Sequence, residues 1–330
     1  MDEETSVMES GDDGIGAAAR LSEGLQAEVR KVVFGQDEVV RQVVAALLAG
    51  GHVLLEGKPG LGKTHMVLAL AEAFGGDFGR VQFTPDLMPT DVTGFTLFDM
   101  KSQTFQTRKG PVFANLLLAD EINRAPAKTQ AALLEVMQER QVTIDGESHV
   151  LSPPFLCFAT QNPIEQEGTY PLPEAQLDRF LMKVIVDYPA VEDEMAVVVA
   201  VTSKAAKGLN TEGVEKICGP EDVVSAQRAV AAIQVVDEVV NYAVRLVRAT
   251  REARGISLGA GTRAAIGLVQ CAKAYALMAG RDFVTPDDIK AAVFPVFRHR
   301  LQVAPEVAIS GQGVEELIED IVGGVEAPRQ

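Results

Sequence analysis

The chain has 330 residues, of which 47% are hydrophobic, so it can bury a large core and is long enough for two domains. Its formal net charge is −16, from 30 basic and 46 acidic residues, which argues against a general electrostatic attraction to nucleic acid or to anionic membranes. No apolar run reaches the roughly 18 residues that span a bilayer, and the N-terminus lacks the basic-then-apolar pattern of a secretory signal. We therefore expect a cytoplasmic protein without membrane insertion.

The predicted elements begin after an acidic tail. Residues 1–18 hold several acids and no base, with Gly and Ser between them, which predicts a disordered segment. From Leu21 onward, helical periods alternate with short apolar runs, which favours an α/β fold with a parallel sheet covered on both faces. Five strands suit a three-layer αβα core, and we expect them at 52–55, 80–83, 115–119, 155–160 and 181–186.

Two segments inside the expected core have the character of hairpins. Residues 141–151 carry Asp145-Gly146 between β-favouring residues, which is the signal of a two-residue hairpin turn. Residues at about 94–108 place several apolar side chains on either side of a polar turn. The register of this second hairpin cannot be read from the sequence.

After about Asp187 the strand signal ends, and long helical patterns follow. We expect these helices at 192–206, 220–233, 235–251, 262–278 and 286–293. The last of them has a clear start, because Thr285 can cap the helix and Pro286 suits the first helical position. The sequence thus predicts a three-layer αβα core over 19–188 and a helical domain over 189–330.

The cysteines and histidines show no ligand spacing. Cys157, Cys218 and Cys271 are too few and too scattered for a disulfide framework or a zinc site, so we expect reduced packing residues. The four histidines likewise indicate no metal site.

The clearest chemical signal is a phosphate-loop pattern, G-x-x-x-x-G-K-[ST], between a strand-like run and a helix-like run. Its residues are Gly57, Lys58, Pro59, Gly60, Leu61, Gly62, Lys63 and Thr64. Glycines let successive backbone N–H groups converge on phosphates, and the positive end of the following helix adds favourable potential. Lys63 would reach the β- and γ-phosphates, and the Thr64 hydroxyl would bind Mg²⁺. The pattern predicts a nucleoside-triphosphate binder.

A pair of acids follows the apolar run 115–119. Asp120 is the candidate for holding Mg²⁺, directly or through water, and Glu121 is the candidate general base that polarises the attacking water. Adjacent acids after a strand are also common as a simple solvated strand end. Together with the phosphate loop, they predict a hydrolase.

Four further stretches resemble a known family, the AAA+ ATPases, and within it the MoxR group of the helix-2-insert clade. They are VQFTPDLMPTD (81–91), LADEINRA (118–125), ATQNP (159–163) and GTYPLPEAQLDRF (168–180). The resemblance covers roughly residues 20–300. It implies an ATPase that uses ATP and Mg²⁺, with a five-stranded αβα core followed by an all-α lid domain.

The resemblance also implies roles for three polar residues. Asn162 would sense the γ-phosphate, although Asn162-Pro163 by itself reads as a turn initiator. Arg179 matches the arginine that such ATPases extend into a neighbouring subunit's nucleotide, with an ion pair inside the subunit as the alternative. Arg263 matches a second sensor that reaches back to the phosphates from the lid, with a solvated arginine in the first helical turn as the alternative.

Two softer assignments come from the same resemblance. Val33-Phe34-Gly35-Gln36 resembles the segment that lines the adenine pocket, and a loop that enters the next helix is the alternative. Gln82 occupies a position where a polar residue in many AAA+ proteins restrains the catalytic glutamate. It is equally well explained as a plain glutamine at a strand end.

The resemblance implies a homo-oligomeric ring, a hexamer in this family, that remodels or activates a protein substrate. The insert at about 94–108 and the hairpin at 141–151 would face the channel or substrate side, unless both are passive surface hairpins. MoxR-type proteins commonly act with von Willebrand factor A-domain proteins, and this chain shows no D-x-S-x-S motif, so that partner would be a separate polypeptide. The alternatives are a nucleic-acid motor or loader, a magnesium-chelatase-type subunit, and a nucleotide-gated scaffold.

Overall fold

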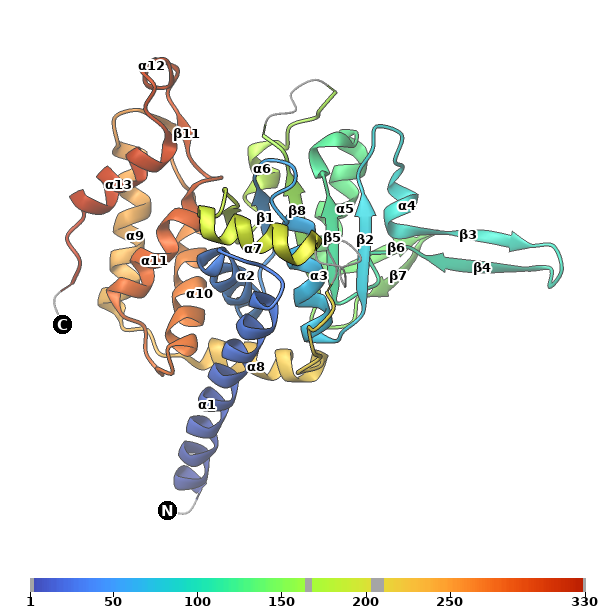
Figure 1. The fold of residues 1–330 in the computed structure, drawn as a ribbon, viewed down its shortest axis with the longest axis horizontal. Coiled ribbons are helices and arrows are strands. Elements are labelled where there is room, and N and C mark those ends of the chain that lie inside the picture. Colours follow the sequence, from blue (N-terminus) through green and yellow to red (C-terminus); the bar gives the residue numbers. More distant parts are fainter. Residues whose placement is uncertain (1–2, 164–167, 203–210, 329–330) are drawn as a thin grey trace.

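A five-stranded parallel sheet forms the centre of the molecule (Figure 1). The computed structural model describes residues 3–163, 168–202 and 211–328. The strand order is β2-β5-β8-β1-β9. The strands are β1 (Val53–Glu56), β2 (Phe78–Gln82), β5 (Leu116–Asp120), β8 (Leu156–Gln161) and β9 (Met182–Ile185). The predicted five-stranded α/β core is confirmed, with strand boundaries displaced by a residue or two.

Alternating side chains of the central strands enter two separate hydrophobic clusters. In β5, Leu116 and Leu118 pack on the face covered by α2 (Asp37–Ala49) and α3 (Lys63–Phe74). Leu117 points the other way, toward α5 (Ala127–Glu139). A parallel strand that is buried on both faces must be apolar throughout, which explains why the run before Asp120 contains no polar residue.

The N-terminal segment differs from the prediction. Helix α1 extends over Glu3–Arg30, where the sequence predicts a disordered tail over 1–18. Ala18, Leu25 and Val29 are buried against the core. The helical segment contains no proline, so packing of its C-terminal half supports a helix that continues through the acidic residues.

The lid follows β9 and consists mainly of helices, as predicted. It contains α7 (Val191–Thr202), α8 (Pro220–Ala232), α9 (Asp237–Glu252), α10 (Thr262–Met278), α11 (Pro286–Phe297), α12 (Pro305–Ile309) and α13 (Val314–Gly324). The end of the helix predicted at 192–206 lies outside the described residues. A short antiparallel pair, β10 (Ile256–Leu258) with β11 (Gln302–Val303), was not predicted. No described helix meets the length and apolarity that a membrane crossing requires.

The predicted start of α11 is confirmed in detail. The Thr285 hydroxyl accepts a hydrogen bond from the Asp288 N–H, and the Asp288 carboxylate accepts one from the Thr285 N–H in return. Arg281 holds the same carboxylate through two hydrogen bonds of 2.7 and 2.8 Å. This capping box stabilises the first turn of the helix.

The two predicted hairpins are present and differ in their packing. The first, β3 (Gly94–Asp99) with β4 (Thr104–Lys109), projects away from the body, next to the short α4 (Pro89–Thr93) (Figure 1). The second, β6 (Gln141–Ile144) with β7 (Glu147–Val150), packs Val142 and Ile144 into the core. Its turn residues Asp145 and Gly146 both have positive φ angles, as a tight hairpin turn requires.

His52 is a buried histidine that joins β1 to two other elements. Its Nδ1 accepts a hydrogen bond from the Cys157 N–H, at 2.9 Å, and its Nε2 lies 3.0 Å from the Met137 carbonyl oxygen. Nδ1 is therefore unprotonated, and Nε2 is the donor. Burial lowers the pKa of His52 from 6.5 to about 4.

The first prediction concerns the pH dependence of stability. Between pH 6.5 and 4 the unfolded chain binds a proton at His52 and the folded chain does not, so the free energy of unfolding falls as the pH drops through this window. The expected loss from His52 is about 3 kcal/mol. Urea unfolding at a series of pH values should show a shallower slope for His52→Asn. An unchanged slope in His52→Asn would contradict the assignment.

Candidate active site

The phosphate loop lies between β1 and α3, as the motif requires. Gly60 and Gly62 have φ angles of 83° and 80°, in the left-handed region that favours glycine. Gly62 directly precedes the first residue of α3, so the loop delivers its backbone N–H groups to a helix N-terminus. A cavity of about 470 Å³ adjoins this loop. It is lined by residues 59–65, Leu68, Arg80, Gln82, Asp120, Glu121, Thr160, Gln161 and Asn162.

Lys63 folds back on the loop that precedes it. Its ammonium group donates to the carbonyl oxygens of Gly57 and Lys58. Partial burial lowers its pKa. These backbone partners hold the cation at the mouth of the loop, where an anion in the cavity can replace them.

Asp120 ends β5 and is 8% exposed. One carboxylate oxygen, Oδ1, accepts from the Thr160 hydroxyl at 2.7 Å. The other, Oδ2, accepts from the Thr64 hydroxyl at 3.2 Å and from Arg80 Nη2 at 2.8 Å. Thr160 and Arg80 were not identified from the sequence. A polar residue directly after the apolar run 156–159 was the available signal for Thr160.

The residues present fit a magnesium ion that binds together with phosphates. Thr64 and Asp120 bring a hydroxyl and a carboxylate together, which are oxygen ligands that Mg²⁺ accepts. Within the described ranges, no group of three or more His, Cys, Asp and Glu side chains is arranged to hold a metal ion. Mg²⁺ in nucleotide sites uses one or two protein ligands and completes its shell with water and phosphate oxygens. The donor set therefore matches a nucleotide-dependent metal site.

Glu121 follows Asp120 in a left-handed backbone conformation, with φ at 55°. Its N–H donates to the Thr160 hydroxyl at 2.8 Å. Its carboxylate accepts from Gln82 Nε2 at 2.8 Å and from Arg124 Nη1 at 2.9 Å. The restraint that the resemblance implies for Gln82 is thus present as a hydrogen bond, while Arg124 is a second restraint that the sequence reasoning did not single out.

A second cavity, of about 410 Å³, shares Pro59 to Gly62 and His65 with the first. Phe34 lines it, as expected for the segment 33–36, together with Tyr188 and residues of α7. Gly35 lies beside it with φ at 66°, and any side chain there would collide with Asp193. Lys58 lies over the Tyr188 ring, 4.7 Å from the ring centroid. This mostly apolar space adjoins the phosphate loop and has the character of a base pocket.

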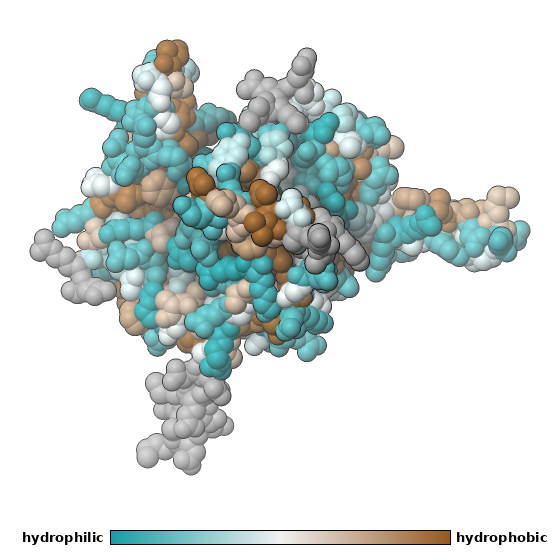
Figure 2. Space-filling model, in the orientation of Figure 1, coloured by the Kyte–Doolittle hydropathy of each residue, from teal (hydrophilic) through white to brown (hydrophobic). Residues whose placement is uncertain are grey.

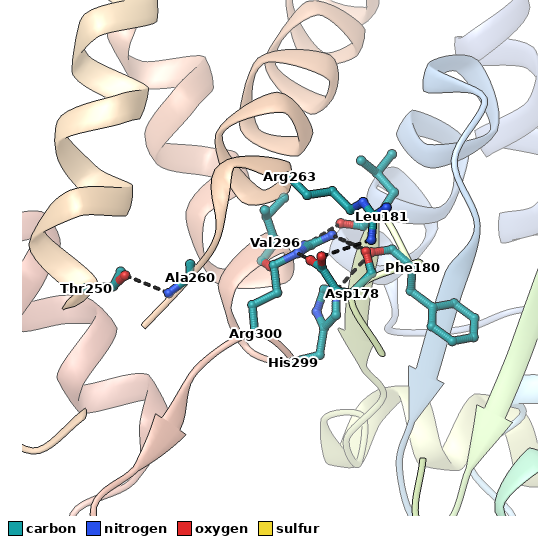
Figure 3. Close-up of polar contacts among 9 residues, drawn as sticks. All are labelled: Asp178, Phe180, Leu181, Thr250, Ala260, Arg263, Val296, His299 and Arg300. Atoms are coloured by element: carbon teal, nitrogen blue, oxygen red, sulfur yellow. Dashed lines mark hydrogen bonds and ion pairs between the residues drawn. The ribbon is translucent and has the colours of Figure 1, made fainter. Parts of the chain in front are cut away.

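Two candidate arginines, Arg179 for a neighbouring subunit and Arg263 as the second sensor, lie outside the first cavity. Arg179 Nη1 donates to the Leu134 carbonyl oxygen at 2.5 Å. Arg263, in the first turn of α10, donates to Asp178 Oδ2 at 3.1 Å (Figure 3). Neither lines the cavity beside the phosphate loop. Asn162, by contrast, is buried at the end of β8 and lines it.

Asp178 is held from its other side by Arg300, which sequence reasoning missed. The Arg300 side chain is 3% exposed and donates to Asp178 Oδ1 at 2.7 Å (Figure 3). It also donates to the backbone carbonyl oxygens of Asp178, Phe180, Leu181 and Val296. Burial lowers the pKa of Arg300, and Asp178 opposes that shift. This cluster fastens the lid to the segment that carries Arg179.

Comparisons with known proteins agree with this architecture. Residues 52–182 match the family model of the "ATPase family associated with various cellular activities (AAA)", and residues 248–321 match that of the AAA lid domain. The crystal structure of a proposed ATPase from Cytophaga hutchinsonii superimposes with a TM-score of 0.89 at 41% identity, over 98% of this chain and 99% of that one. The fold and the site therefore define an AAA+ ATPase with a core and a lid.

Sequence relatives narrow the family further. The chain is 43% identical to chaperone MoxR1 of Mycobacterium tuberculosis, over 91% of this chain and 83% of the relative. It is 32% identical to protein MoxR of Methylorubrum extorquens, over 94% and 95%. It is also 45% identical to the uncharacterized protein YeaC of Bacillus subtilis, over 92% and 93%. The chain belongs to the MoxR family of AAA+ ATPases.

The second prediction compares the two arginines on Asp178. Removing Arg300 leaves the Asp178 carboxylate with only the half-exposed Arg263 as a cation and takes one donor from each of four backbone carbonyl oxygens, so Arg300→Met should lower the free energy of unfolding by about 3–5 kcal/mol. Arg263 is 54% exposed on the same carboxylate, so Arg263→Met should cost at most about 1 kcal/mol. Urea denaturation of the two variants measures both values. Equal losses would show that Arg300 does not fasten the lid.

Proposed function

We propose that this chain hydrolyses ATP with Mg²⁺ at sites shared between the subunits of a homo-oligomeric ring, and that the ring remodels or activates a partner protein. One observation carries the proposal. Lys63, Thr64, Asp120, Glu121 and Asn162 all line one cavity, while Arg179 and Arg263 lie outside it. We infer that the rest of the site comes from two sources: Arg263 from the lid, and Arg179 from a neighbouring chain.

The residues of the cavity divide the work of hydrolysis. The loop N–H groups and Lys63 hold the phosphates, with Lys63 exchanging its two backbone carbonyls for phosphate oxygens. Thr64 and Asp120 would hold Mg²⁺, which supplies charge neutralisation at the phosphates. Glu121 accepts the proton of the attacking water once Gln82 and Arg124 release its carboxylate. Asn162 orients that water or a phosphate oxygen through its amide.

Arg179 is placed to leave its present contact. It donates a hydrogen bond to the backbone carbonyl oxygen of Leu134, and it lies in a half-buried segment after α6 (Glu174–Leu177). The guanidinium is permanently charged and binds phosphate through two parallel hydrogen bonds. Supplied across a subunit interface, it stabilises charge that develops in the transition state.

The third prediction tests the shared site by subunit mixing. Arg179→Ala and Glu121→Gln should each lose about 10³-fold or more in ATP turnover, because each removes one group that acts in the transition state. Mixing the two inactive proteins should restore hydrolysis, since some interfaces then combine an intact Glu121 with an intact Arg179. The control Arg248→Ala, on the exposed side of α9, should keep full activity. Full ATP turnover by Arg179→Ala alone would contradict an active site that is shared between subunits.

The projecting β3–β4 hairpin supports action on a protein. Leu97, Phe98, Met100 and Phe105 are 45%, 53%, 84% and 75% exposed. Figure 2 shows apolar side chains along this projecting hairpin. Phe98 and Phe105 pack edge to face, with centroids 5.2 Å apart. Exposed aromatic and thioether side chains at the end of a projection suit contact with apolar segments of another protein.

The β6–β7 hairpin has a different character. Its apolar residues Val142 and Ile144 are buried, and Val150 is its only large hydrophobic residue that is strongly exposed within the described part of the chain. We therefore assign substrate contact to β3–β4. Family resemblance makes a von Willebrand factor A-domain protein the proposed partner.

The fourth prediction tests this contact in the Glu121→Gln background, which should trap the ATP-bound state. Phe105→Ser should reduce capture of a co-expressed von Willebrand factor A-domain partner by about tenfold or more, because a large apolar contact is lost. ATP turnover of Phe105→Ser in the wild-type background should stay within about twofold, since the hairpin lies away from the cavity.

Val150→Ser is the matched control for this experiment. Val150 is 77% exposed on the other hairpin, so its replacement removes a comparable exposed apolar group without touching β3–β4. Capture should stay at the level of the parent protein. Equal capture by Phe105→Ser would exclude the projecting hairpin as the contact surface.

A further inference from the structure

Strand β2 carries two polar residues that both reach the acids at the end of the neighbouring strand β5. Arg80 and Gln82 are exposed, whereas Val81 between them is buried. Arg80 Nη2 lies 2.8 Å from Asp120 Oδ2, and Gln82 donates to Glu121. Because side chains two apart share a face of a strand, β2 presents one partner to each carboxylate.

The position of Arg80 conflicts with the expected position of the metal ion. Asp120 Oδ2 accepts from Arg80 and from the Thr64 hydroxyl, and these two oxygens are the proposed Mg²⁺ ligands. Oδ1 is already used by Thr160. A guanidinium N–H and a divalent cation compete for the same oxygen, and their positive charges repel each other at this separation.

The two partners of this ion pair differ in burial. The Asp120 side chain is 11% exposed, so its charge is costly to leave without a partner. The Arg80 side chain is 48% exposed, so it can move into solvent at little cost. Losing its charged partner therefore costs the buried carboxylate more free energy than it costs the arginine.

We propose that Arg80 is a displaceable counter-ion for Asp120: it pairs with the carboxylate when no divalent cation is bound, and it leaves when the cation arrives. This inference rests on the proposed Mg²⁺ role of Asp120. Arg80 is a positioning residue in this scheme, since it acts through Asp120. Arg80 Nη2 also lies 3.5 Å from Gln82 Oε1, and Gln82 in turn holds the Glu121 carboxylate. When Arg80 leaves, Gln82 loses this neighbour, so binding of the metal ion also affects the hydrogen bond that holds Glu121.

The test measures metal affinity directly, with Mn²⁺ as the probe. Electron paramagnetic resonance reports free Mn²⁺ during titration of the full chain with saturating ADP, which requires no turnover. Arg80→Ala should bind Mn²⁺ about three- to tenfold more tightly than wild type, because the competing cation is gone. Arg80→Lys, which keeps a cation, should fall between them. Arg248→Ala changes the net charge equally on α9 and should match wild type.

A thermal measurement provides a second readout. In EDTA, Arg80→Ala should melt at a lower temperature than wild type, because Asp120 has lost its counter-ion, and millimolar Mg²⁺ should restore most of the difference. Arg248→Ala should show no such Mg²⁺-dependent recovery. This readout separates loss of the ion pair from a general folding defect, which Mg²⁺ would not correct.

The outcomes separate the inference from the function on which it rests. If Asp120→Asn abolishes Mn²⁺ binding and Arg80→Ala leaves it equal or weaker, the metal site stands and the counter-ion role of Arg80 is overturned. If Asp120→Asn binds Mn²⁺ as well as wild type does, the proposed metal site fails and the inference fails with it.

Discussion

The Asp120 carboxylate is the group on which the arrangement of the site depends. Three donors from three elements converge on it: Thr64 from α3, Arg80 from β2 and Thr160 from β8. Parallel strands end at one edge of the sheet, so donors that are distant in the sequence meet there without long loops. A buried charge needs such partners. The Asp120 carboxylate has them because the strand order places β2 and β8 beside β5 and because the phosphate loop brings the start of α3 to the same edge.

The lid depends on a second buried charge. Arg300 lies between α11 and the segment after α6, where it donates to the Asp178 carboxylate and to four backbone carbonyl oxygens. Asp178 therefore shares its two oxygens between a buried arginine and the exposed Arg263. Since Arg179 is the next residue in the chain, the lid contact also fixes where that arginine leaves the core. The position of the lid and the position of Arg179 therefore both depend on the contacts of the Asp178 carboxylate.

The sequence predicted the parts of the structure that local patterns encode. The five strands were found because buried parallel strands are apolar throughout, and the phosphate loop was found because its glycine, lysine and threonine spacing is a local pattern between a strand and a helix. Arg300 was missed because its partner Asp178 is 122 residues away and no local pattern marks the pair. The tail was predicted from composition, whereas α1 is supported by packing of Leu25 and Val29, which composition does not describe. Arg80 was missed because only the register of β2 on β5 brings it to Asp120.

The two acids at the end of β5 are held in different ways, and this difference has a mechanistic consequence. Within the described part of the chain, the carboxylate of Glu121 accepts hydrogen bonds from the side chains of Gln82 and Arg124, both of which are partly exposed. Its backbone is held in the unfavourable left-handed region by the hydrogen bond from its N–H to Thr160. The same Thr160 hydroxyl donates to Asp120. The Glu121 side chain can therefore turn toward water while Thr160 keeps the Glu121 backbone and the Asp120 carboxylate in place, so the proposed general base would be released without moving the proposed metal ligand.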